Sequence, residues 1–106
     1  MAFGVGISGY PEAGDEPLWS VETPWWNTDE LTYDPRFKDA SWCPGYADYE
    51  AVVTPDEAKR LSANYAPNAT MDHFKTRMNN LDRKLSNRDG RLDRVQITVF
   101  EWGSGF

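Results

Sequence analysis

The side chains best suited to covalent or acid–base chemistry in this chain are one histidine and one cysteine. An imidazole titrates near neutral pH and can act as a general base, and a thiolate is a nucleophile. His73 lies on the polar side of a predicted helix, beside Arg77 and Lys84, which indicates a solvated position. Cys43 carries no local catalytic signature. We therefore expect no catalytic residue and no enzymatic activity.

Acidic residues could supply a glycosidase pair or a magnesium site, but no spacing selects one pair. The single cysteine excludes a disulfide within the chain, and with one histidine it excludes the usual structural zinc patterns. The Gly4-Val5-Gly6 run lacks the third glycine of a dinucleotide fingerprint, and no phosphate loop is present. We expect no metal and no cofactor.

The charge of the chain is divided unevenly between its two parts. Residues 1–57 hold twelve acidic side chains against two basic ones, a formal charge of −10, whereas residues 58–106 hold nine basic against five acidic ones, a charge of +4. An array of carboxylates attracts a basic protein and speeds its association. The net charge of −6 disfavours nucleic acid. The pattern predicts a basic protein partner.

Aromatic residues concentrate in the same acidic part, which we call the acidic aromatic segment. Tryptophan and tyrosine are enriched at interface hot spots. The alternative is that the tryptophans fill the core, but neighbours in an extended segment point in opposite directions, so we expect Trp25 or Trp26 to be partly exposed. The predicted partner-binding residues are Trp25, Trp26, Asp29, Glu30, Tyr33, Asp34, Asp39, Trp42, Tyr46, Asp48 and Glu50.

Two terminal strands are predicted by residues that alternate between two faces. In the first strand Val5 and Ile7 share one face and Gly4 and Gly6 the other, and residues 94–102 alternate in the same way. We expect the two strands to be neighbours, with the aromatic side chains at positions 100 and 102 covering the glycines. Residues 18–22 could form a short strand within a long loop from 11 to 44.

The remaining elements are a strand and two helices. Residues 46–53 alternate as a half-exposed strand with an acidic outer face. Thr54 and Glu57 form a capping box for a helix that ends near Ala66. A second helix is predicted over 69–86, with one narrow apolar side made of Met71, Phe74, Met78, Leu81 and Leu85, followed by a turn at 87–90. The order predicts a single α+β domain over 1–106, an antiparallel or mixed sheet with two helices packed on one face.

The chain resembles the small acidic immunity proteins that bacteria encode beside secreted polymorphic toxins. The resemblance rests on its length, its acidity, the helix start Val53-Thr54-Pro55-Asp56-Glu57-Ala58 and the closing Val99-Phe100-Glu101-Trp102-Gly103-Ser104-Gly105. It implies a cytoplasmic protein that masks the active site of one cognate toxin. Phage-encoded inhibitors of host defence and small carbohydrate-binding modules are the alternatives. The chain shows no signal-peptide pattern and no long apolar run, so we expect a soluble protein without membrane contact.

Overall fold

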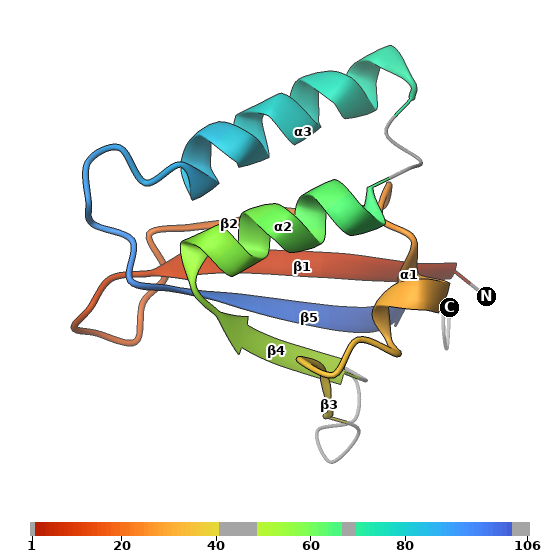
Figure 1. The fold of residues 1–106 in the computed structure, drawn as a ribbon, viewed down its shortest axis with the longest axis horizontal. Helices are drawn as coiled ribbons and strands as arrows, with labels where there is room; N and C mark the ends of the chain where they lie inside the picture. The colour runs from red at the N-terminus through yellow and green to blue at the C-terminus, as the bar shows by residue number, and fades with distance from the viewer. Residues whose placement is uncertain (1, 41–48, 67–69, 103–106) are drawn as a thin grey trace.

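The computed structural model describes residues 2–40, 49–66 and 70–102, and shows the predicted α+β architecture (Figure 1). Within these ranges the strands form one antiparallel sheet in the order β2-β1-β5-β4-β3. The strands are β1 (Ala2–Tyr10), β2 (Trp19–Glu22), β3 (Lys38–Asp39), β4 (Tyr49–Val53) and β5 (Arg94–Trp102), and the helices are α1 (Thr28–Leu31), α2 (Pro55–Tyr65) and α3 (Asp72–Leu85).

The two long strands β1 and β5 are neighbours, as predicted, and pair along their whole length from Ala2–Trp102 to Tyr10–Arg94. A Cβ added to Gly6 would lie 3.4 Å from a ring atom of Phe100, so this aromatic side chain does cover a glycine. The side chain of Trp102 lies outside what the structure describes. Alternation predicted the two strands, and the bare glycines facing large aromatic side chains predicted their pairing.

The core lies between one face of the sheet and the helices α2 and α3, which pack against each other (Figure 1). The predicted inward positions Val95, Ile97 and Val99 are fully buried. Leu61 of α2 and Leu81 of α3 are buried against them. Both helices cover the same face, and no helix of the described residues lies on the other face of the sheet.

The predicted start of α2 is confirmed, and the predicted start of α3 is corrected. Thr54 and Glu57 form the capping box of α2: the Thr54 hydroxyl accepts from the Glu57 amide, and the Glu57 carboxylate accepts from the Thr54 amide. In α3 the first helical residue is Asp72, and Ala69 lies outside the described residues. Met71 precedes the helix and is 54% exposed, so its assignment to the apolar side was wrong.

The region predicted as a long loop has more regular structure than expected. The short strand β2 is confirmed, and α1 and β3 are additional elements that the sequence reading missed. Both are short, four and two residues, which gives a periodic pattern too little length to be recognised. Of the strand predicted over 46–53, the structure describes and confirms Tyr49–Val53.

Among the helices of the described residues, none combines the length and the apolar character needed to span a membrane.

Candidate functional site

Among the described residues of the acidic aromatic segment, the most exposed aromatic ring lies just after α1. Tyr33 follows this helix and is 88% exposed, and Asp29 and Glu30 in the first turn are also exposed. The helix is fixed to the rest of the domain because Leu31 is fully buried and the Asn27 amide donates to the Tyr65 carbonyl at 2.6 Å. Two carboxylates and one tyrosine ring therefore stand together on a braced helical turn, which we call the α1 surface.

Asp34, one residue further, faces inward and has a structural role. Its carboxylate accepts from the Arg36 amide at 2.9 Å, from the Arg36 guanidinium at 3.0 and 3.2 Å, and from the Tyr65 hydroxyl at 2.9 Å. Burial alone would raise the pKa of Asp34, but these hydrogen bonds and the Arg36 charge outweigh it and hold the pKa below the ordinary value. The assignment of Asp34 to a partner surface is not supported, because its side chain is only 6% exposed.

Arg36 connects this cluster to α2. Its Nε atom lies 3.4 Å from a Glu57 carboxylate oxygen, so one guanidinium serves two carboxylates. The pKa of Glu57 is lowered first by the Thr54 amide and hydroxyl of the capping box, and then by Arg36. Arg36 therefore neutralises part of the negative charge of residues 1–57 through ion pairs with Asp34 and Glu57.

The expectation that Trp25 or Trp26 is exposed was wrong, since the two side chains are 1% and 2% exposed. Trp25 packs 5.7 Å from the Phe74 ring and 5.3 Å from the Arg77 guanidinium, measured between centres. The two residues belong to a turn that follows Pro24, not to an extended segment, so the opposite-face rule does not apply to them. Both indole N–H groups are buried without a hydrogen-bond partner in the described part of the chain.

Of the other predicted partner-binding residues, the structure describes Asp39 and Glu50. Lys38 is paired with Glu50 across β3 and β4, and Asp39 with Tyr49, so Asp39 and Glu50 point to opposite faces of the sheet. Asp39 is exposed and Glu50 is half-buried. Trp42, Tyr46 and Asp48 lie outside the described residues. Asp29, Glu30 and Tyr33 are the members that the structure groups together.

The two candidate catalytic residues contribute no described site. His73 is exposed, and its ring centre lies 4.2 Å from that of Phe74. Cys43 lies outside the described residues. Among the residues that the structure describes, no three or more His, Cys, Asp or Glu side chains are arranged to hold a metal ion.

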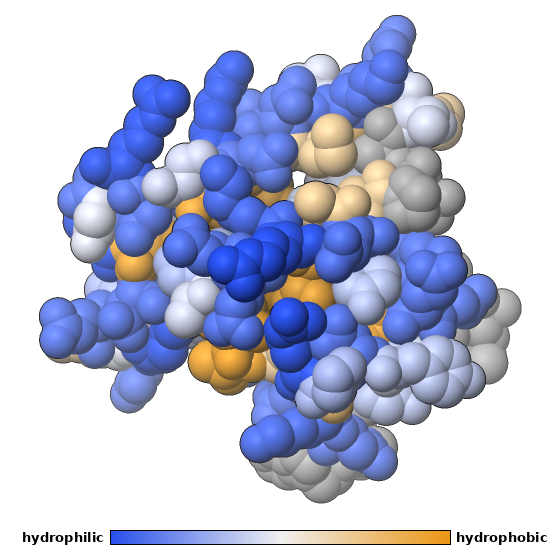
Figure 2. Space-filling model, viewed as in Figure 1, coloured by the Kyte–Doolittle hydropathy of each residue, from blue (hydrophilic) through white to orange (hydrophobic). Residues whose placement is uncertain are grey.

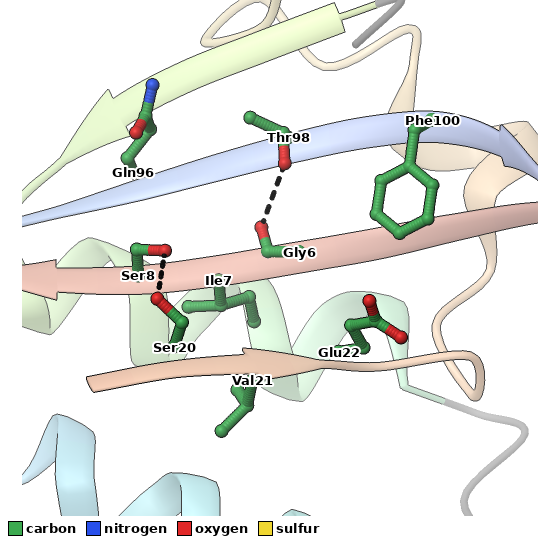
Figure 3. A pocket seen from close by; sticks show the side chains of 9 residues that line it. All are labelled: Gly6, Ile7, Ser8, Ser20, Val21, Glu22, Gln96, Thr98 and Phe100. Atoms are coloured by element: carbon green, nitrogen blue, oxygen red, sulfur yellow. Dashed lines mark hydrogen bonds between the residues drawn. The ribbon is translucent and has the colours of Figure 1, made fainter. Parts of the chain in front are cut away.

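The face of the sheet without helices has a shallow polar hollow of about 310 Å³ (Figure 3). Ser8 and Ser20 share a hydrogen bond of 2.8 Å across β1 and β2, and the Thr98 hydroxyl donates to the Gly6 carbonyl at 3.4 Å. The hydroxyl groups of Ser8, Ser20 and Thr98 therefore already have hydrogen-bond partners within the sheet. Phe100 is the aromatic ring at this hollow, so the paired tryptophan rings expected of a carbohydrate site are not present among its lining residues.

Figure 2 shows the face on which the helices are seen. Hydrophilic side chains cover most of it, and hydrophobic residues are visible only in small separate areas. Large exposed apolar patches are the usual mark of hydrophobic docking sites. Polar and charged groups therefore make up most of the surface seen in this view.

A cleft that the sequence reading missed lies between the start of β2 and the turn after α3. It encloses about 530 Å³, and its charged lining consists of Arg83, Lys84, Arg88, Arg91 and Asp89. We call it the basic cleft. The signal in the sequence is the run of cations from 83 to 91.

Comparison with protein-family models, curated proteins and solved structures found no match to this chain.

Proposed function

We propose that this protein is a non-catalytic inhibitor that binds a basic protein partner through the α1 surface. The observation that carries the proposal is the 88% exposure of Tyr33 on a helical turn that is anchored on both sides. The Asn27–Tyr65 hydrogen bond holds its start, and the Asp34 cluster holds the residues that follow. A ring carried on a backbone that is fixed before binding costs less conformational entropy to order than one on a flexible loop.

The charges beside Tyr33 suit a basic partner. Asp29 and Glu30 form no ion pair within the described residues, in contrast to Asp34 and Glu57. Unpaired carboxylates next to an exposed ring combine electrostatic steering with an aromatic anchor. The net charge of −6 adds a long-range attraction for a basic surface.

The class of partner follows from the same chemistry and from the resemblance to immunity proteins. An enzyme that cleaves nucleic acid must present a basic cleft to the phosphate backbone. An acidic surface with a protruding ring is complementary to such a cleft and would exclude the substrate from it. We therefore propose an immunity protein that masks the active site of a cognate toxin of this kind in the cytoplasm.

The test is co-expression with the protein encoded by the adjacent gene, followed by growth measurement and titration calorimetry of the purified pair. Tyr33→Ala should weaken the complex by about 2 kcal/mol, as expected for an interface hot spot. Asp29→Asn with Glu30→Gln should slow association and reduce its dependence on salt. The triple variant that combines Tyr33→Ala, Asp29→Asn and Glu30→Gln should protect growth less than the wild type.

The matched control is Asp15→Asn with Glu16→Gln, which removes the same charge from the exposed loop between β1 and β2. The control should retain most of the affinity. A triple variant that protects and binds as well as the wild type would rule out the α1 surface. Failure of the adjacent gene product to bind the wild-type protein would count against the immunity proposal itself.

A further inference from the structure

The basic cleft gathers four cations that form no ion pair within the described residues. Arg36 is paired with Asp34 and Glu57, and Arg94 donates to two backbone carbonyls at 2.8 and 3.2 Å. In contrast, no ion pair within the described residues involves Arg83, Lys84, Arg88 or Arg91.

Four like charges around one cleft repel one another, and this repulsion is relieved when an anion binds between them. The one carboxylate of the lining, Asp89, accepts from the backbone amide of Arg91 at 3.2 Å and is in no ion pair with the part of the chain that the structure describes. Its bond stabilises the turn that carries two of the four cations. The cleft therefore keeps a strong positive charge in a protein that is acidic overall.

The turn that carries Arg88 and Arg91 is held by the side chain of Asn87. Asn87 adopts a left-handed φ of 55°, and its side chain donates to the Leu92 carbonyl and accepts from the Leu92 amide, both at 2.8 Å. Gly90 has a φ of 70°, which glycine adopts without strain. The two arginines thus project from a turn of fixed shape.

The cleft also has an apolar lining, which comes from Leu18, Trp19 and Leu92. A Cβ on Gly9 would lie 2.6 Å from the Trp19 ring and 2.5 Å from Leu92, so only the bare glycine lets both side chains pack against β1. The Lys84 ammonium lies 5.9 Å from the centre of the Trp19 ring. Cations and an indole ring therefore border the same space.

We propose that the basic cleft binds a small phosphate-bearing ligand of nucleotide size. Guanidinium groups match phosphate oxygens with two parallel hydrogen bonds, and three arginines and a lysine can engage a compact ligand with several negative charges. The volume of about 530 Å³ lies within the range of small-molecule sites. Trp19 and Leu18 offer contact to the uncharged part of the ligand.

A long polyanion fits less well than a compact one. The net charge of −6 repels an extended phosphate backbone outside the cleft, whereas a small ligand meets only the local cations. The absence of a phosphate-loop motif from the sequence does not bear on this site, because side chains of α3 and its following turn supply the positive charge here.

The test is titration calorimetry of the full chain at low salt with ATP and with inorganic tripolyphosphate as probes. Both should bind at one site per chain, and ATP should bind more tightly because it also contacts the apolar lining. Arg88→Gln with Arg91→Gln should weaken both probes by about tenfold or more, since hydrogen bonds between charged groups are lost. These two side chains are exposed, so circular dichroism should show an unchanged fold.

The matched control is Lys38→Gln with Lys75→Gln, which removes the same charge elsewhere. Lys38 lies on β3, at the opposite sheet edge from β2, and Lys75 lies in the first turn of α3. The control should change affinity by less than about twofold, within the effect of a distant surface charge. No saturable binding of either probe, or equal weakening by the control, would overturn the proposal. Equal affinity for ATP and tripolyphosphate would overturn the role assigned to Trp19.

Discussion

The α1 surface and the basic cleft are both charged, but they are stabilised in different ways. Next to α1 the carboxylate of Asp34 is held by an ion pair and a tyrosine hydroxyl. At the basic cleft the cations are unpaired, and the turn that carries them is held by the neutral amide of Asn87. The density of charged residues along the sequence therefore does not predict where unpaired charge remains in the folded protein. Ion pairs neutralise charge beside α1, whereas the cations of the basic cleft are in no ion pair within the described residues.

The largest expected effect is the difference in stability between truncating a buried and an exposed aromatic residue of the acidic aromatic segment. Trp25→Ala should lower the free energy of unfolding by about 3 to 5 kcal/mol, because it removes a fully buried ring from the core. Tyr33→Ala should lower it by less than about 0.5 kcal/mol, as for most exposed positions. Urea denaturation of both variants measures the difference. Equal losses would mean that the Tyr33 ring is also part of the packing.

The sequence predicted the parts of the fold that depend on regular spacing. The alternation in β1 and β5 identified the central pair of strands, and the capping box located the start of α2. The exposure of Trp25 and Trp26 was predicted wrongly because the conformation of the turn at Pro24–Trp26 follows no periodic pattern. The direction of a side chain in such a turn depends on the packing around it.

The candidate sites were harder to predict because they combine distant segments. The basic cleft brings Trp19 next to Lys84, and this contact depends on the pairing of β2 with β1 and on the packing of α3. The pairing of Arg36 with Glu57 joins residues 21 positions apart. No local pattern in the sequence predicts either contact.

The next effect concerns the side-chain ion pair beside α1. Asp34→Asn should lower the free energy of unfolding by about 2 kcal/mol at pH 7, because hydrogen bonds from a charged partner and from Tyr65 are weakened. The folded-state pKa is below the ordinary value of 3.8, so this stabilisation is complete above that value and is lost as the pH falls through the folded-state pKa. The difference between wild type and variant should therefore shrink in strongly acidic solution.

Urea denaturation between pH 7 and pH 2.5 tests this dependence. Asp29→Asn is the control, because Asp29 is exposed and has no ion pair within the described residues, and it should change stability by less than about 0.5 kcal/mol. A loss for Asp34→Asn that stays constant over the whole pH range would contradict the role of its negative charge.

The smallest expected effect concerns Asn87, whose uncharged side chain holds the turn at the basic cleft. Asn87→Gly keeps the left-handed backbone accessible but removes two hydrogen bonds to Leu92, so it should lower the free energy of unfolding by about 1 kcal/mol. Asn87→Ala should cost about 1 kcal/mol more, since alanine disfavours a positive φ. Because an amide does not titrate, the loss for Asn87→Gly should be the same at pH 7 and at pH 3, unlike that for Asp34→Asn. The same urea series measures both variants, and a pH-dependent loss at Asn87 would show that the turn is held by charge after all, which would remove the distinction between the two surfaces.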